Sequence, residues 1–325
     1  MSLFPVDVSW QVASGGVFEL KHPYSPMPLS SPQTDIRIGT LVKADETAPS
    51  YIRQILPHGF ESFSLTFWKE IPEGLNFPDF AKSVKDVLED KAVISSLGMF
   101  GNPLQEEATV RGWERCIDAA HLFGCDVVAG FAGAVEGKPL PESMPQFKAV
   151  WSELARRAED RGVRVAFENC DMGGWWHDVR WNVAHAPSAW EMMFHEVPSK
   201  ALGLEWEPCH QMYSLIDPLP QLRKWVDRVY HVHGKDATIA WDVLKTYGIR
   251  GGRDYVWHRT PGFGDTNWSD VITILRQAGF KGSIDIEGWH DPVYRDDLEM
   301  TGQVHGLNYL KNCRGGAYVP NPVVA

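Results

Sequence analysis

The feature that most constrains the fold is a regular alternation of short apolar runs with longer amphipathic stretches. Eight short runs have the composition typical of β-strands: residues 36–42, 60–67, 93–97, 126–130, 163–167, 202–206, 229–233 and 283–287. Helical periods follow them: residues 51–56, 77–90, 106–123, 143–160, 188–196, 218–226, 268–278 and 300–310. Eight strand-then-helix units predict an α/β protein with a parallel (β/α)8 barrel.

The rest of the chain falls outside this pattern. Residues 1–34 are rich in Pro, Ser and Gly. We expect an N-terminal extension there, a single barrel domain over residues 35–312 and a tail over 313–325. A long stretch after the seventh strand, up to about Asn267, is expected to be a loop. A doubly wound open sheet is the alternative fold, but the first strand lacks the Gly-x-Gly-x-x-Gly turn of a dinucleotide-binding unit.

Charge and cysteine usage exclude several classes of partner. The formal net charge is −11 and no basic patch stands out, which argues against nucleic acid. No apolar run approaches the roughly 20 residues of a membrane span, so no membrane partner is expected. The five cysteines are widely spaced, and the N-terminus lacks a secretory pattern. Both observations predict a reducing, cytoplasmic location. The oligomeric state is not set by these features, and a homo-oligomer is one of the possible partners.

Four consecutive predicted strands end in carboxylate or imidazole side chains. Glu168 ends the fifth strand, Glu207 and His210 follow the sixth, His233 ends the seventh and Glu287 ends the eighth. The C-terminal ends of barrel strands meet at one mouth, so these side chains should converge. Three carboxylates so close would repel unless a cation lay between them. Three oxygen donors with one imidazole suit Mn²⁺, Mg²⁺ or Co²⁺ better than a thiolate-rich zinc site.

The same strands leave some assignments open. His231 and His233 share one strand face; hydrogen bonding in the core explains His231 at least as well as ligation does, whereas the strand-end position of His233 favours ligation. Glu205 and Glu207 also share a face, with Glu207 nearer the mouth. Cys209 is interpreted as a small apolar filler rather than a ligand.

These strand ends resemble those of the xylose isomerase-like TIM barrel family, which includes sugar phosphate isomerases and epimerases and endonuclease IV (AP endonuclease family 2). The resemblance covers roughly residues 36–311 and is strongest after Val163. It rests on five motifs: Phe-Glu-Asn at 167–169, Gly-Leu-Glu-Trp-Glu-Pro-Cys-His at 203–210, His-Val-His-Gly-Lys-Asp at 231–236, Pro-Gly-Phe-Gly at 261–264 and Ile-Asp-Ile-Glu at 284–287.

The resemblance implies a sugar isomerase or epimerase that acts on a small-molecule keto-sugar through a metal-bound enediolate. Glu168 and Glu287 would exchange the protons. One divalent ion, Mn²⁺ first and Mg²⁺, Co²⁺ or Zn²⁺ as alternatives, would be held by Glu168, Glu207, His233 and Glu287. The family usually has Asp where this chain has Glu207. Substrate contacts are expected from residues around the mouth: His210, Lys235, His258, Arg259, Trp289 and His290.

Other functions share parts of this pattern. A lyase or glycoside-cleaving enzyme acting on 3-keto sugars would use the same ligands, and the motifs do not separate it from an epimerase. The endonuclease branch needs further histidines after the second and third strands, where this chain has Thr-Phe-Trp (66–68) and Gly-Met-Phe (98–100). A non-catalytic sugar-binding barrel would be expected to have lost ligands. Lys235 and Asp236 could form a structural ion pair with each other instead of binding substrate. Arg259 could likewise form a salt bridge within its loop instead of contacting substrate.

Overall fold

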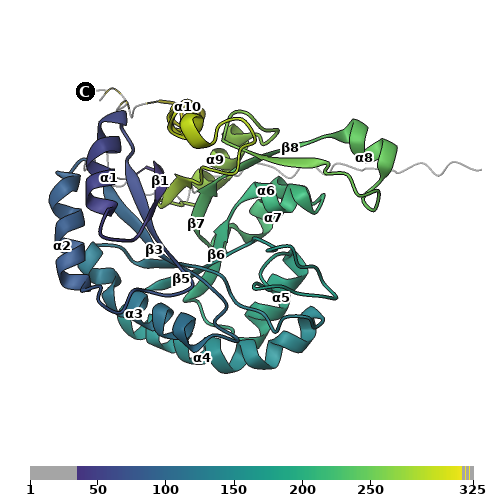
Figure 1. The fold of residues 1–325 in the computed structure, drawn as a ribbon, viewed down its shortest axis with the longest axis horizontal. Coiled ribbons are helices and arrows are strands. Elements are labelled where there is room, and N and C mark those ends of the chain that lie inside the picture. The colour runs from purple at the N-terminus through teal and green to yellow at the C-terminus, as the bar shows by residue number, and fades with distance from the viewer. Residues whose placement is uncertain (1–34, 317–318, 320–321, 323–325) are drawn as a thin grey trace, which may run out of the picture. The chain divides into compact units, whose positions relative to one another are not determined.

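The structure is a computed structural model that describes residues 35–316, 319 and 322, so the extension predicted over residues 1–34 lies outside the described residues. Eight strands build the barrel: β1 (Arg37–Lys43), β2 (Ser62–Trp68), β3 (Val93–Phe100), β4 (Val127–Gly130), β5 (Arg164–Glu168), β6 (Leu202–Trp206), β7 (Val229–Gly234) and β10 (Ser283–Ile286). They are parallel and close in the order β1-β10-β7-β6-β5-β4-β3-β2 (Figure 1). The predicted (β/α)8 fold is therefore confirmed.

Helices cover the outside of the barrel: α1 (Ala48–Ile55), α2 (Phe77–Leu88), α3 (Glu107–Phe123), α4 (Met144–Arg161), α5 (Pro187–Glu196), α7 (Pro218–Trp225), α9 (Trp268–Gln277) and α10 (Glu299–Arg314). Short 3-10 turns join some of them: η2 (Leu56–His58), η3 (Leu140–Ser143), η4 (Val226–Arg228) and η5 (Asp296–Leu298). α3 and α4 end at Gly124 and Gly162, which adopt the left-handed conformation that glycine favours. None of the described helices has the length and apolar character that crossing a membrane requires.

The apolar core lies between the strands and the helices. Trp113 of α3 and Trp151 of α4 pack edge to face with ring centroids 4.9 Å apart. Trp151 in turn lies 4.5 Å from the ring of Phe167 on β5, again edge to face. These fully buried aromatic side chains fix α3 and α4 against the strands. The strand ends at the mouth are thereby held on a rigid scaffold.

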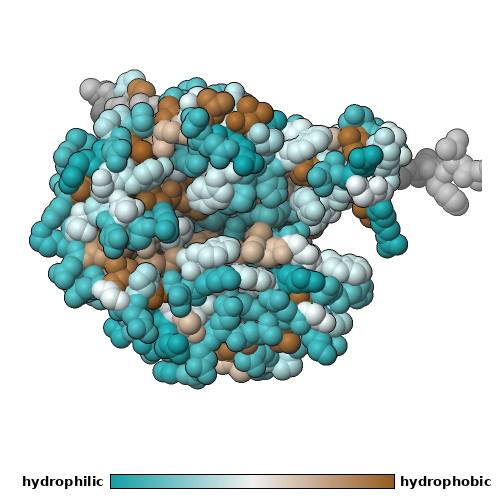
Figure 2. Space-filling view, viewed as in Figure 1, coloured by the Kyte–Doolittle hydropathy of each residue, from teal (hydrophilic) through white to brown (hydrophobic). Residues whose placement is uncertain are grey.

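The segment expected to be a long loop contains an excursion, which we call the arm. It consists of β8 (Asp236–Ile239), α8 (Trp241–Tyr247) and β9 (Val256–Arg259), with β8 and β9 paired antiparallel. The arm projects to the right of the barrel in Figure 1. Figure 2 shows a largely hydrophilic surface with a hydrophobic group near α8; the exposed large side chains of this segment include Trp241, Tyr247 and Ile249.

A second unpredicted element is α6 (Pro208–Tyr213), directly after β6. Both the arm strands and α6 are too short to carry a recognisable hydrophobic period. β8 is also stabilised by a partner some twenty residues further along the chain, a pairing that local sequence does not encode. α6 sets the direction of His210 and Cys209, so this missed element belongs to the mouth.

Candidate functional site

The inside of the barrel carries two layers of acidic and histidine side chains, one above the other. β7, and β6 and β10 together with the residue that directly follows each of them, contribute two residues spaced two apart, which point to the same face of extended backbone. The lower layer consists of Glu205, His231 and Asp285. The upper layer, nearer the mouth, consists of Glu207, His233 and Glu287, joined by Glu168 from the end of β5. All these side chains are buried.

The lower layer is held together by direct hydrogen bonds. His231 lies between two carboxylates, with Nδ1 2.7 Å from Glu205 Oε1 and Nε2 2.7 Å from Asp285 Oδ2. Ser62 and Ser95 donate their hydroxyls to Asp285. Burial opposes a charged imidazole, but the two carboxylates outweigh it and raise the pKa of His231 above its usual value. His231 is therefore a hydrogen-bonded core residue, as the first of its two interpretations predicted.

One ligand-type atom from each member of the upper layer lies within 4.8 Å of the others: Glu168, Glu207, His233 and Glu287. These are the four positions that the sequence predicts as metal ligands. The strand order places β5 and β10 at the two ends of the set, with β6 and β7 between them. Glu168 and Glu287 thus flank Glu207 and His233. Glu205, the competitor of Glu207, points to the lower layer instead.

The lower layer leaves Glu205 Oε2 without a hydrogen-bond partner, whereas the upper layer leaves several such buried atoms: Glu207 Oε1, Glu287 Oε2 and both ring nitrogens of His233. These atoms have near neighbours that are not aligned as donors and acceptors. His233 Nε2 faces Glu205 Oε1 of the lower layer at 3.0 Å, and Glu207 Oε1 lies 3.0 Å from His210 Nε2. His233 Nδ1, for example, lies 3.3 Å from Glu287 Oε2 and 3.5 Å from Glu168 Oε1. Buried polar atoms nearly always find a partner. A cation between them would supply one, and the oxygen-rich donor set suits a divalent ion.

The two outer carboxyl groups of the upper layer are not equivalent. Burial raises the pKa of Glu168 well above its usual value, and the neighbouring Glu207 carboxylate raises it further. Burial acts in the same direction on Glu287, but the Lys235 ammonium and two nearby imidazoles outweigh it and hold the pKa of Glu287 well below its usual range. Different surroundings thus separate two residues of identical chemistry.

Lys235 reaches the site from the end of β7, whereas its neighbour Asp236 turns away. The buried Lys235 Nζ donates to Glu287 Oε1 at 2.8 Å. Asp236 accepts hydrogen bonds from the Thr266 N–H and from the Trp268 indole, each at 3.0 Å. The structural interpretation of Asp236 is therefore borne out, but its partners are backbone and indole groups rather than Lys235. These bonds also anchor the base of the arm.

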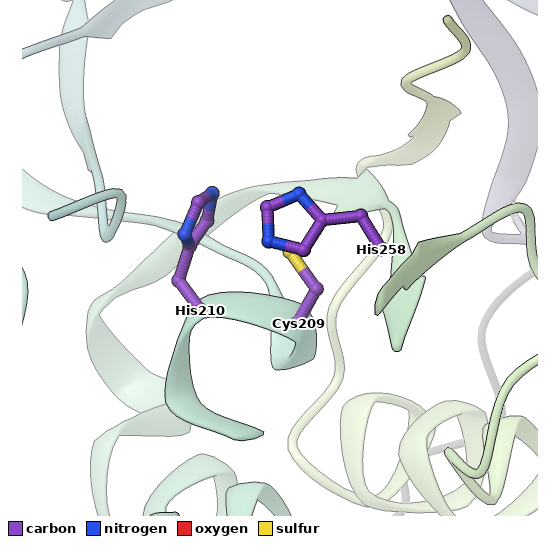
Figure 3. Close-up of side chains that lie close together, drawn as sticks. All are labelled: Cys209, His210 and His258. Atoms are coloured by element: carbon purple, nitrogen blue, oxygen red, sulfur yellow. The ribbon is translucent and has the colours of Figure 1, made fainter. Parts of the chain in front are cut away.

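A second cluster lies beside the upper layer, where α6 and the arm meet (Figure 3). The ring centroids of His210 and His258 are 4.9 Å apart and the rings are nearly perpendicular. Cys209 lies next to them, with Sγ 3.4 Å from Glu207 Oε2. Burial and the Lys235 ammonium lower the pKa of His258 to about 3, and burial raises the pKa of the Cys209 thiol. The Cys209 thiol and the His258 imidazole are therefore uncharged. We call the paired rings of His210 and His258 the His210–His258 wall.

A cavity of about 440 Å³ opens above the upper layer, and five predicted substrate-binding residues line it: His210, Lys235, His258, Trp289 and His290. Trp289 has a φ of 49°, a left-handed backbone conformation that costs free energy for a bulky residue. Residues strained in this way are concentrated at functional sites. Arg259 is not part of this lining. Its Nε donates to Asp291 Oδ2 at 3.0 Å, the structural ion pair that was its alternative. A substrate contact from Arg259 stays a prediction.

Aromatic residues that the sequence reasoning did not select line the other side of this cavity. Trp68 ends β2, Phe100 ends β3 and Phe131 directly follows β4. The second and third of these strand ends lack the histidines of the endonuclease branch, but they carry a different signal: three consecutive strands end in, or are directly followed by, an aromatic residue. The mouth thus has a polar half from β5, β6, β7 and β10 and an aromatic half from β2, β3 and β4.

A larger cavity, of about 510 Å³, lies at the opposite end of the barrel. Residues at the starts of strands line it, among them Arg37 and Ser283, and it reaches the lower layer at His231. The active sites of (β/α)8 enzymes lie at the C-terminal ends of the strands. The chemistry of the upper layer also faces that end, so the 440 Å³ cavity is the candidate site.

Comparison with known proteins agrees with this architecture. An inosose dehydratase from Clostridium tetani is 27% identical over 186 residues, which is 53% of this chain and 60% of that protein, so less than two thirds of the relative is matched. The structure of 3-keto-D-glucoside 4-epimerase from E. coli superposes with a TM-score of 0.63 at 15% identity, over 86% of this chain and 100% of that one. The IolI protein with a bound zinc atom gives 0.59 at 14% identity, over 86% and 96%.

At such identities the solved structures establish the shared fold alone. The family itself is established by a sequence model, described as the xylose isomerase-like TIM barrel, that matches residues 52–313. That range contains all four members of the upper layer and the arm, and it agrees with the resemblance drawn from the strand-end motifs. This chain belongs to the xylose isomerase-like TIM barrel family.

Proposed function

We propose that this chain is a divalent-metal-dependent sugar isomerase or epimerase that moves a proton at the carbon beside a carbonyl group of a keto-sugar. The observation that carries the proposal is the contrast between the two layers. In the lower layer Glu205 Oε2 alone lacks a partner, whereas the upper layer leaves Glu207 Oε1, Glu287 Oε2 and His233 Nδ1 without hydrogen-bond partners beneath a cavity. A bound cation and substrate would give these three atoms their partners.

The residues that would hold the cation are Glu168, Glu207, His233 and Glu287. When bound, a divalent ion polarises a substrate carbonyl and so makes the adjacent C–H more acidic. The donor set fits Mn²⁺, Mg²⁺, Co²⁺ and Zn²⁺, and Mn²⁺ is our first choice. Zn²⁺ is the alternative, because the structurally similar IolI protein binds a zinc atom. Glu207 provides the longer side chain where the family usually has Asp.

The proton transfers fall to Glu168 and Glu287. Because β5 and β10 are the outer strands of the set, the two carboxylates approach a ligand above the upper layer from different sides. One takes a proton from the carbon and the other returns one, which inverts the centre or moves the carbonyl. Lys235 Nζ at 2.8 Å and His290 Nε2 at 3.0 Å hold Glu287 Oε1 in place. Lys235 and the His210–His258 wall then face the substrate oxygens.

Elimination of water or of another β-substituent is the second candidate. It begins with the same proton abstraction, and it is favoured by the sequence similarity to the inosose dehydratase of Clostridium tetani. Its further requirement is a proton donor for the departing oxygen. Lys235 and His290 both line the cavity and carry donors. The two reactions therefore differ in the fate of the substrate rather than in the ligand set.

The decisive experiment combines metal analysis with isotope exchange. Purified protein, Glu168→Gln, Glu287→Gln and a matched surface control, Glu153→Gln, are incubated with Mn²⁺, Co²⁺ or Zn²⁺ and desalted. We expect about one ion per chain in the wild type and in the control, whose Glu153 side chain is 72% exposed. Both site variants should retain much less metal.

A panel of ketoses, keto-cyclitols and 3-keto glucosides in D₂O then separates the two reactions. Isomerisation or epimerisation incorporates deuterium beside the carbonyl without loss of any group. Elimination releases water or an alcohol and leaves a conjugated enone. A wild-type protein that binds none of the three ions, or that binds them but exchanges no substrate proton across the panel, would contradict the proposal.

A further inference from the structure

We propose that the cavity binds a keto-glycoside, with its sugar ring over the upper layer and an aromatic aglycone against the aromatic half of the mouth. The proposal deepens the function proposed above and rests on it for the position of the sugar ring. It assigns a specificity role to Trp68, Phe100 and Phe131, which we call the aromatic row. These residues have no part in the proton transfers.

The aromatic row begins at a predicted metal ligand. The ring centroid of Phe100 lies 6.3 Å from that of His233, with an angle of 30° between the planes. Phe131 packs edge to face on Phe100 at 5.2 Å, and Trp68 packs edge to face on Phe131 at 6.2 Å. The apolar surface is therefore continuous from the upper layer outwards, so a molecule held over His233 has the row beside it.

The outer end of the row is an exposed indole. Trp68 is 57% exposed, although its neighbours Phe100 and Phe131 are buried. Trp181 stacks on it with centroids 5.7 Å apart and planes 24° from parallel, and Lys69 Nζ lies 4.7 Å from the Trp181 ring. These contacts support Trp68 while leaving more than half of it open to solvent. A large supported aromatic surface at a mouth is suited to stacking against a second ring.

The size of the cavity exceeds the need of a single sugar. A hexose occupies roughly 200 Å³ at the packing density of protein interiors, whereas the cavity has about 440 Å³. A ligand that buries most of its surface here thus needs a further group of about the size of one more ring. Trp68, Phe100 and Phe131 line this cavity together with the polar residues, and with the sugar ring over the upper layer we place the additional ring against the aromatic row.

The chemistry of this half favours an aromatic aglycone over a second sugar. A sugar ring needs partners for its hydroxyl groups. On this side the Thr66 hydroxyl hydrogen is already used, since it donates to the carbonyl of Val42 at 3.3 Å. Asp171, in the loop after β5, accepts one hydrogen bond from the Gly173 N–H at 2.9 Å and keeps acceptor sites for one further polar contact, whereas the aromatic row offers none. Leu41 and Met172 add only apolar and thioether surface. A flat apolar ring is matched by these surroundings.

The test compares probes that differ only in the aglycone. Phenyl and methyl β-glucosides and their 3-keto forms are titrated calorimetrically into Mn²⁺-loaded protein. The variants are Trp68→Ala, Phe131→Leu, which keeps apolar volume but removes a ring, and Trp241→Ala as a matched control. Trp241 is 51% exposed on the arm and does not line the cavity. We expect wild type and control to bind the phenyl compound roughly tenfold more tightly than the methyl compound.

Trp68→Ala should bring the phenyl-to-methyl affinity ratio close to one, and Phe131→Leu should lower it severalfold. Equal affinities for the two aglycones in the wild type would overturn the proposal, and so would a ratio unchanged in both row variants. The function itself is read separately, from deuterium exchange into the 3-keto compounds. A phenyl preference without exchange would support the aglycone site and count against the proton-transfer function; exchange without a phenyl preference would do the reverse.

Discussion

Replacing His231 by leucine should cost this protein a large part of its stability. The imidazole is 1% exposed and bridges Glu205 and Asp285, which are both fully buried, with two contacts of 2.7 Å. Leucine removes the positive charge and both donors, so Asp285 keeps only the Ser62 and Ser95 hydroxyls as partners, and Glu205 Oε1 keeps only its 3.0 Å contact with His233 Nε2. Breaking a buried ion pair in this way costs about 3–5 kcal/mol. Whole domains are stable by only about 5–15 kcal/mol.

The same reasoning predicts a change of sign for a second substitution. In the wild type, Asp285→Asn removes a charge-assisted hydrogen bond to His231 and should destabilise by about 1.5–3 kcal/mol. In the His231→Leu background, Asp285→Asn instead removes one unpaired buried charge, so it should stabilise the protein. A coupling of this kind is specific to a charged network, because a purely steric defect would only accumulate.

Urea unfolding followed by tryptophan fluorescence measures all four variants of this cycle at pH 7. Asp126→Asn is the matched control, because Asp126 pairs with Arg164 at 2.9 Å but is 61% exposed. It should change stability by no more than about 1 kcal/mol. A loss below about 1 kcal/mol for His231→Leu, or a destabilising Asp285→Asn in both backgrounds, would refute the view of the lower layer as a buried ionic network.

Three further predictions concern other parts of the barrel. Arg314 donates to the Glu61 carboxylate at 2.6 and 3.0 Å. Burial raises the pKa of Glu61, but the Arg314 pairing and the Ile38 N–H outweigh it and bring this pKa below its ordinary 4.5. The ion pair therefore stabilises the folded protein fully above pH 4.5, and this stabilisation is lost as the pH falls through the lower pKa of the folded state. Arg314→Met should therefore cost about 1.5–3 kcal/mol at pH 7 and progressively less in acid, as pH-dependent unfolding curves would reveal; an equal cost at all pH values contradicts the pairing. Gly39→Ala should prevent stable folding, because its Cβ would overlap Ser62 O and Asp285 Oδ1, and expression with circular dichroism checks this against Gly74→Ala, whose Cβ meets open space. Divalent metal at 100 times its Kd should stabilise the wild type by about 2.7 kcal/mol, a shift in thermal unfolding that Glu207→Ala should greatly reduce.

The features predicted correctly from sequence are those encoded locally. The barrel strands are short, mostly buried segments with an apolar outer face, and each covering helix has its own period, so the element order follows from the chain itself. The four residues of the upper layer were found because strand ends in a closed barrel must converge. That convergence needs no knowledge of side-chain conformation, which is why Glu207 was preferred to Glu205 from its position alone.

The features that sequence left open between two interpretations are those that depend on distant partners. Lys235 and Asp236 are adjacent in sequence but point to different surroundings, one to Glu287 and the other to the base of the arm. Arg259 has a donor-rich side chain at the mouth, yet its pairing is set by Asp291, thirty-two residues later. An aromatic residue at three consecutive strand ends is a weak signal, because buried aromatic residues are common in barrel cores, and the exposure of Trp68 is what makes the aromatic row distinctive.

The division of the mouth into a polar half and an aromatic half also follows the order of the chain. All four members of the upper layer lie between residues 168 and 287, whereas the aromatic row lies between residues 68 and 131. Exchange of the first four strand-and-helix units between homologues would therefore alter the apolar half of the mouth and leave the carboxylate and imidazole set intact. In such a barrel, new substrate preferences can arise by recombination or drift in one half, while purifying selection on the reaction chemistry acts on the other.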